Sequence, residues 1–277
     1  MLALSAGTAF AFDPETKVNP DDEPRTILRY GYNALKSGKF DQAIGAFRLG
    51  AKKNDLASQW KLARMLQTGN GVERDDVAAY NLYAKIANRF ADRAPKGHDR
   101  AYVSHAVVAI GLYSLTGIKG TNVRANPRRA EDHFYRAAAL YKDPEAQYQL
   151  GALYRNGRLG VKQPRSAARW FGLAARKGHP YAQAQLGEML FYGEGVRKSP
   201  VRGLVFMTKA AGATARQGVS KIDDMRREAF ARASQAQRRA AEKIIAELQL
   251  QPNRSVRRFA LEVPGVGGQA LPASQTD

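Results

Sequence analysis

The residue types that carry out chemistry are present in this chain, but their spacing predicts neither a catalytic centre nor a metal site. No two of the four histidines have the four-residue spacing that places two zinc ligands on one helix face; they are His98, His105, His133 and His179. The chain has no cysteine, which excludes disulfides, thiolate ligands and cysteine nucleophiles. We therefore expect a protein that is not an enzyme and that binds no cofactor. The alternative for His98 and His105 is a pH-sensing role, because histidine titrates near neutrality.

Two other patterns that could indicate sites have a structural explanation. The segments Gly69-Asn70-Gly71 and Gly193-Glu194-Gly195 lack the strand and the Lys-Ser/Thr of a phosphate-binding loop. The adjacent carboxylates Asp75-Asp76 and Asp223-Asp224 stand where helices are expected to begin, and acidic side chains stabilise the helix dipole there. These residues indicate turns and helix caps.

The elements that carry these residues come from an internal repeat. The sequence from Ala146 to Gly151 matches that from Ala182 to Gly187 at an offset of 36 residues. The same offset separates Gly157 from Gly193, and Pro164 from Pro200. Matches at so many positions with one period predict a repeat architecture.

Two more degenerate copies precede these, and they contain the pairs Leu62-Ala63 and Ile110-Gly111. They are longer than the later copies. The extra residues lie in polar stretches that contain glycine or proline, between Phe90 and Ala101 and between Gly117 and Asn126. We expect these stretches to be surface loop insertions.

Each copy has the pattern of two packed helices. The first helix carries small residues on the face that meets its neighbour, and glycines then end it and turn the chain. The second helix is expected to begin where proline or aspartate suits a first helical turn, at Asp76, Pro127, Pro164 and Pro200. Trp60 and Trp170 fall at packing positions, so we expect both in the core.

This pattern resembles the Sel-one-like repeat, a relative of the tetratricopeptide repeat, and Ala146 to His179 matches it almost throughout. The segment from Tyr32 to Phe47 resembles a tetratricopeptide helix pair. The resemblance implies an all-α fold, an α/α solenoid of such helix pairs with a C-terminal capping helix.

The expected order along the chain follows from these patterns. Apolar residues from Ile222 to Ile244 recur at steps of three and four, which predicts one long helix. Its arginines form either a solvated face or a surface that docks an acidic partner or a membrane. We expect a signal-peptide remnant at 1–11, a linker at 12–24, a tetratricopeptide-like pair at 25–54, four Sel-one-like repeats at 55–215, the capping helix at 216–250 and a disordered tail at 251–277.

The first residues predict export. Residues 1–11 are apolar and small, and they end in Ala9-Phe10-Ala11, as the second half of a secretory signal peptide does. Cleavage is expected after Ala11, with the mature protein in the periplasm. No stretch approaches the roughly 20 apolar residues that span a bilayer, so we expect no membrane insertion.

The formal net charge is +19, which predicts attraction to something acidic. The basic residues are scattered through the repeats, with no dense run, and this argues against a nucleic-acid partner. The classes of partner that remain are an anionic membrane surface, an acidic glycan or cell wall, and an acidic patch on a protein. The alternative is that the charge is mainly a solvated face.

The combination of a signal-like start that runs into Ala11-Phe12-Asp13-Pro14, one tetratricopeptide-like pair and degenerate repeats with long insertions is more specific. It resembles the periplasmic exopolysaccharide-production negative regulators (the ExoR type) of rhizobia and their relatives, over roughly residues 9 to 249. The resemblance implies a repressor that holds the periplasmic sensor domain of a membrane histidine kinase inactive. It implies a periplasmic protease as a second partner. The alternatives are an exported protein that binds acidic glycan or cell wall, and a generic Sel-one-like scaffold.

A helical solenoid binds along the groove that its first helices line. The polar residues of these helices that packing does not need form the predicted partner-binding set. They are Gln59, Lys61, Arg64, Gln149, Arg155, Gln185 and Glu188.

Overall fold

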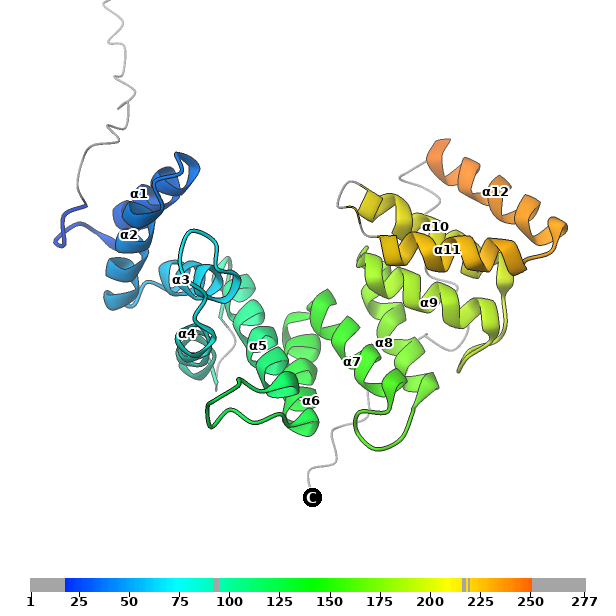
Figure 1. The fold of residues 1–277 in the computed structure, drawn as a ribbon, viewed down its shortest axis with the longest axis horizontal. Helices are drawn as coiled ribbons and strands as arrows, with labels where there is room; N and C mark the ends of the chain where they lie inside the picture. The colour runs from blue at the N-terminus through cyan, green and yellow to red at the C-terminus, as the bar shows by residue number, and fades with distance from the viewer. Residues whose placement is uncertain (1–17, 92–94, 216–217, 219, 251–277) are drawn as a thin grey trace, which may run out of the picture. The chain divides into compact units, whose positions relative to one another are not determined.

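The computed structural model describes residues 18–91, 95–215, 218 and 220–250 (Figure 1). Within these residues the regular structure consists of α-helices and one π-helical turn, without any strand. The all-α prediction is confirmed. The predicted signal-peptide remnant, its cleavage site after Ala11 and the predicted tail from Gln251 lie outside the described residues.

The chain divides into two compact units between Ala106 and Val107, a point inside α5 (Asp99–Thr116). The first unit contains the start of α5 and two helix pairs, α1 (Pro24–Lys36) with α2 (Phe40–Lys52), and α3 (Leu56–Thr68) with α4 (Asp76–Arg89). The second unit contains the rest of α5 and then α6 (Pro127–Arg136), η1 (Ala137–Tyr141), α7 (Pro144–Asn156), α8 (Pro164–Arg176), α9 (Pro180–Tyr192), α10 (Pro200–Thr214), α11 (Ser220–Arg232) and α12 (Gln235–Leu250).

The helix ends follow from local chemistry. Prolines open α6, α8 and α10 at the predicted positions Pro127, Pro164 and Pro200. Side chains cap the starts of other helices: Asp143 Oδ1 accepts a hydrogen bond from the backbone N–H of Ala146 at 3.0 Å. The first helix of the third repeat ends at Gly157, whose φ of 68° is the left-handed conformation that ends helices at little cost only for glycine.

Glycines inside the first helices let the second helices approach closely. A Cβ at Gly151 would lie 2.5 Å from Cδ1 of Phe171, a ring on α8 that is fully buried. Gly31, Gly111 and Gly187 meet Phe47, Phe134 and Met207 in the same way. The small residues predicted at this face are therefore the holes into which the large side chains of the second helix pack.

The segment expected to form one capping helix forms two. The helix is interrupted at Ala233-Ser234, between α11 and α12. Ser234 Oγ accepts a hydrogen bond from the N–H of Gln237 at 3.2 Å, and Gln237 Oε1 accepts one from the N–H of Ser234 at 3.0 Å. This reciprocal pair is a capping box, which starts a new helix and so overrides the continuous apolar spacing. Both helices pack against α10 (Figure 1).

Candidate binding surface

The predicted binding residues lie in both units. Lys61 and Arg64 are on α3 of the first unit, and they are half-buried and exposed respectively. The second unit carries four others on two neighbouring first helices, α7 and α9. These are Gln149 and Arg155 on α7 and Gln185 and Glu188 on α9, all partly exposed.

Gln59 does not belong to the set. Its side chain is 1% exposed, and its Nε2 donates a hydrogen bond to the carbonyl of Ala51 at 3.3 Å. Gln183 of α9 makes the equivalent bond, at 3.1 Å, to the carbonyl of Ala175 near the end of α8. A glutamine here adds a second hydrogen bond to a carbonyl at the end of the preceding helix, since Ala51 and Ala175 already accept from the N–H groups of Asn54 and Gly178. The polar side chain of Gln59 therefore serves an internal hydrogen bond and is not available to a partner.

Arg155 collects the other predicted residues of the second unit into one cluster. Its guanidinium donates to Gln185 Oε1 at 2.5 Å and to Glu188 Oε2 at 2.6 Å. It also pairs with Glu194, with 2.6 Å between Nη2 and Oε2. The Arg155 side chain is 17% exposed, and these carboxylates raise its pKa against the opposing effect of burial. Sequence analysis missed Glu194, which lies in the Gly193-Glu194-Gly195 segment that was interpreted only as a turn.

A second polar group surrounds the start of α9. Glu145 accepts a hydrogen bond from Gln149 Nε2 at 2.7 Å and lies 2.9 Å from His179 Nε2. His179 caps α9, because its Nδ1 accepts from the N–H of Ala182. Its ring stacks on that of Tyr148 at 4.7 Å. Gln149, like the Arg155 cluster, is thus held by contacts within the repeats.

The first unit presents a different surface, which we call the basic-aromatic face. It is formed by Tyr32 of α1, by Trp60, Lys61 and Arg64 of α3, and by Tyr102 and His105 of α5. Lys61 Nζ lies 5.3 Å from the centre of the Tyr32 ring, and the guanidinium carbon of Arg64 lies 5.5 Å from the ring of Trp60. Both are cation–π distances.

Aromatic contacts fix this face. The Trp60 ring lies 5.2 Å from Tyr102 and 5.7 Å from His105. Trp60 is half-buried, so the expectation of a core position holds only in part, whereas Trp170 is 5% exposed. Burial, and then the neighbouring charge of Arg64, lower the pKa of Lys61. Sequence analysis missed Tyr32 and Tyr102 because aromatic residues in repeat helices more often pack in the core.

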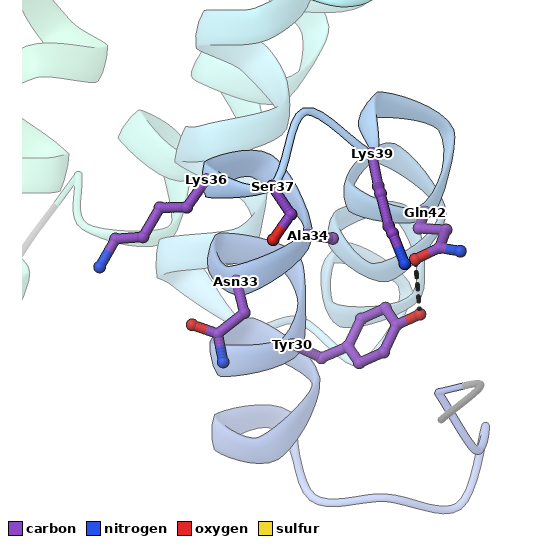
Figure 2. Close-up of a pocket in the computed structure, with 7 residues that line it drawn as sticks. All are labelled: Tyr30, Asn33, Ala34, Lys36, Ser37, Lys39 and Gln42. Atoms are coloured by element: carbon purple, nitrogen blue, oxygen red, sulfur yellow. Dashed lines mark hydrogen bonds between the residues drawn. The ribbon is translucent and has the colours of Figure 1, made fainter. Parts of the chain in front are cut away.

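A shallow hollow of about 340 Å³ lies beside α1 and α2 (Figure 2). Tyr30 forms one wall and donates a hydrogen bond from its hydroxyl to Gln42 Oε1 at 3.2 Å. The other lining residues are Asn33, Ala34, Lys36, Ser37 and Lys39. Its polar groups are mostly exposed, so it offers little desolvated surface to a ligand.

The arginines of α11 pair with acidic side chains of the same helix. Arg226 pairs with Asp223 at 2.7 Å, Arg227 with Asp224 at 2.5 Å, and Arg232 with Glu228 at 2.8 Å. Each pair is formed within α11 at a spacing of three or four residues. The arginines of α11 therefore form a mixed-charge, solvated face, which favours the simpler of the two interpretations.

Comparison with known proteins identifies the repeats. The family model for the Sel1 repeat matches residues 56–89, 104–141, 144–179 and 180–213. Over 239 residues the chain is 33% identical to the "Exopolysaccharide production negative regulator" of Rhizobium meliloti (strain 1021), covering 86% of this chain and 87% of the relative. The chain belongs to this family of Sel1-repeat proteins. The protein of Rhizobium leguminosarum bv. viciae that is also called "Exopolysaccharide production negative regulator" is 33% identical over 240 residues, with 87% of both chains covered.

A solved structure shows the same Sel1-repeat fold. The crystal structure of a Sel1 repeat protein from Oxalobacter formigenes superposes with a TM-score of 0.61 at 23% identity, over 87% of this chain and 86% of that one. This structure confirms the fold, while the family model and the two regulators confirm the resemblance for the repeat and for the family.

Two features are absent from the part of the chain that the structure describes. None of the helices described here has the length and apolar character needed to cross a membrane. No group of three or more histidine, aspartate or glutamate side chains in that part of the chain is arranged to hold a metal ion.

Proposed function

We propose that this Sel1-repeat protein is a non-enzymatic negative regulator of exopolysaccharide production. It acts in the periplasm, where it binds the sensor domain of a membrane histidine kinase and holds the kinase inactive. The observation that carries the proposal is the 33% identity to negative regulators over 86% of this chain and 87% of theirs. An alignment of this extent includes the repeats together with the elements before and after them, so it is more specific than a match of repeats alone.

The arrangement of side chains supports action by binding. Polar side chains of the first unit are held by aromatic rings on the basic-aromatic face, where Lys61 lies over the ring of Tyr32 and Arg64 over that of Trp60. Such preorganised side chains suit recognition of a folded partner, because little conformational entropy is lost when the partner docks.

A genetic experiment and a biochemical one test the proposal together. Deletion of the gene in its host is expected to raise exopolysaccharide output, and a plasmid copy is expected to lower it again. Crosslinking in the envelope with the tagged chain from Phe12 onward is expected to capture a sensor kinase at physiological and at raised salt. Unchanged exopolysaccharide output in the deletion strain would contradict the proposal.

The net charge of +19 supports a second candidate, binding of acidic glycan or cell wall. The same capture experiment separates the two. Contacts between exposed charges weaken as salt screens them. Recovery of polysaccharide alone, lost at raised salt, would favour the glycan, whereas unrelated proteins in place of a kinase would favour a generic scaffold.

A further inference from the structure

The two groups of predicted binding residues differ in how their charge is balanced. In the second unit Arg155 faces two carboxylates, those of Glu188 and Glu194, within 2.6 Å. In the first unit, no carboxylate among the described residues forms an ion pair with Lys61 or Arg64. Carboxylates therefore already balance the charge of Arg155, whereas Lys61 and Arg64 on the basic-aromatic face have no such ion pair in the described part of the chain.

The position of the two cations makes them a pair. Lys61 and Arg64 are three residues apart on α3, so their side chains leave the same side of the helix. They are close enough for the charge of Arg64 to lower the pKa of Lys61. Asp55, the nearest acid before them on the chain, caps α3 by accepting from the N–H of Ser58 at 2.8 Å. Two like charges held side by side favour the approach of negative charge.

The aromatic rings hold these cations in place. Tyr32 contacts Lys61 and also Phe47, at 5.5 Å between ring centres. Trp60 contacts Arg64, Tyr102 and His105. Because both rings are already in contact with several side chains, they are poorly placed to stack on a sugar or on a nucleobase. The recognition that remains is that of carboxylates by a fixed lysine and a fixed arginine.

We propose that the basic-aromatic face docks an acidic peptide segment of the protein that this chain represses, with carboxylates of that segment paired to Lys61 and Arg64. The inference rests on the proposed function and deepens it, because it assigns the docking to the first unit and gives the partner's chemistry. The Arg155 cluster then serves to hold α7 and α9 together.

A binding measurement on the full purified chain tests the docking. The probe is a fluorescein-labelled peptide of repeated Glu-Ala-Asp-Leu units, followed by fluorescence anisotropy, with the Gln-Ala-Asn-Leu peptide as the uncharged control. Lys61→Gln/Arg64→Gln is expected to weaken binding of the acidic peptide about tenfold or more. The matched variant Arg128→Gln/Arg129→Gln removes the same charge from two exposed positions of α6 and is expected to weaken it less than about twofold. Thermal unfolding of both variants checks that each is folded.

Two results would overturn the docking. Equal weakening by the two variants would mean that the peptide senses only the net charge. Displacement of the peptide from this face by oligogalacturonate, at a lower concentration than by unlabelled peptide, would mean that the face binds acidic glycan.

The deletion strain separates this inference from the proposed function. If the wild-type gene restores low exopolysaccharide output and the Lys61→Gln/Arg64→Gln gene fails to, both are supported. If both genes restore it equally, the docking is contradicted and the regulatory function stands. If the deletion itself changes nothing, the proposed function fails, and the peptide measurement still decides whether the face binds acidic segments.

Discussion

At the scale of single residues, the repeat depends on contacts that only glycine allows. Gly151 lies against the buried ring of Phe171, and an added Cβ would approach that ring to 2.5 Å. The Gly151→Ala variant is expected to lose roughly 1–3 kcal/mol of stability, because the ring or the helix must move. The measurement is the free energy of unfolding in urea.

Gly212 provides the control. It lies in α10 of the same unit with nothing within 4 Å of an added Cβ. Gly212→Ala is expected to stabilise the chain by roughly 0.5–1 kcal/mol, since alanine favours the helix. A similar change in both variants would mean that propensity, and not packing, sets the effect.

Tyr83 carries a pH dependence at the residue scale. Its side chain is buried, its hydroxyl donates to Gln67 Oε1 at 3.0 Å, and burial raises its pKa to about 12. In the unfolded chain the hydroxyl of Tyr83 has a pKa near 10. Between pH 10 and 12 the folded state therefore binds this proton more tightly than the unfolded state does. The stability due to Tyr83 is complete below pH 10 and is lost as pH rises toward 12, by roughly 1–3 kcal/mol.

The comparison of wild type with Tyr83→Phe isolates this group from the lysines that titrate in the same range. We expect the stability of the wild type to fall more steeply than that of the variant between pH 10 and 12. Parallel curves would contradict the assignment.

At the scale of elements, Arg155 joins α7 to α9 and to the loop after it. Its removal leaves Glu188 and Glu194 close together without a cation. We expect Arg155→Gln to destabilise the second unit by roughly 1–3 kcal/mol, because bonds to charged groups are among the stronger ones. Arg158→Gln removes an exposed arginine just after the same helix and is expected to change stability by less than about 0.5 kcal/mol. Urea unfolding of both variants measures the difference.

At the scale of the whole molecule, a repeat array needs its ends covered. In the second unit α12 does this: Ala241 is fully buried in a cluster with Phe191, Leu204 and Met207. Ala241→Arg forces a charge into this cluster and is expected to detach α12, with a loss of several kcal/mol or aggregation. The neighbouring Ala240→Arg is on the exposed side and is expected to be nearly neutral. Thermal unfolding and size-exclusion chromatography compare them, and equal behaviour would argue against this packing.

The repeat, the all-α fold and the family could all be predicted from the amino-acid sequence. These follow from signals that are local or periodic: the offset of 36 residues, the prolines at helix starts and the glycines at turns. The prolines and glycines act within one or two helical turns, and the offset recurs along the chain. Both kinds of signal can therefore be seen without knowing which helices pack together. The capping box at Ser234 and Gln237 is equally local, and it was missed because the apolar stripe runs through it.

Which polar residues are available to a partner depends on how the helices pack. Gln59 and Gln185 are both glutamines of a first helix, yet one is buried on a carbonyl and the other contacts Arg155. Lys61 and Arg155 are both cations of the predicted set, yet only Arg155 has carboxylates within reach. These differences depend on residues about 8 to 39 positions away along the chain, which packing brings together. A sequence gives the charge of a side chain, but its partners exist only once the helices have packed.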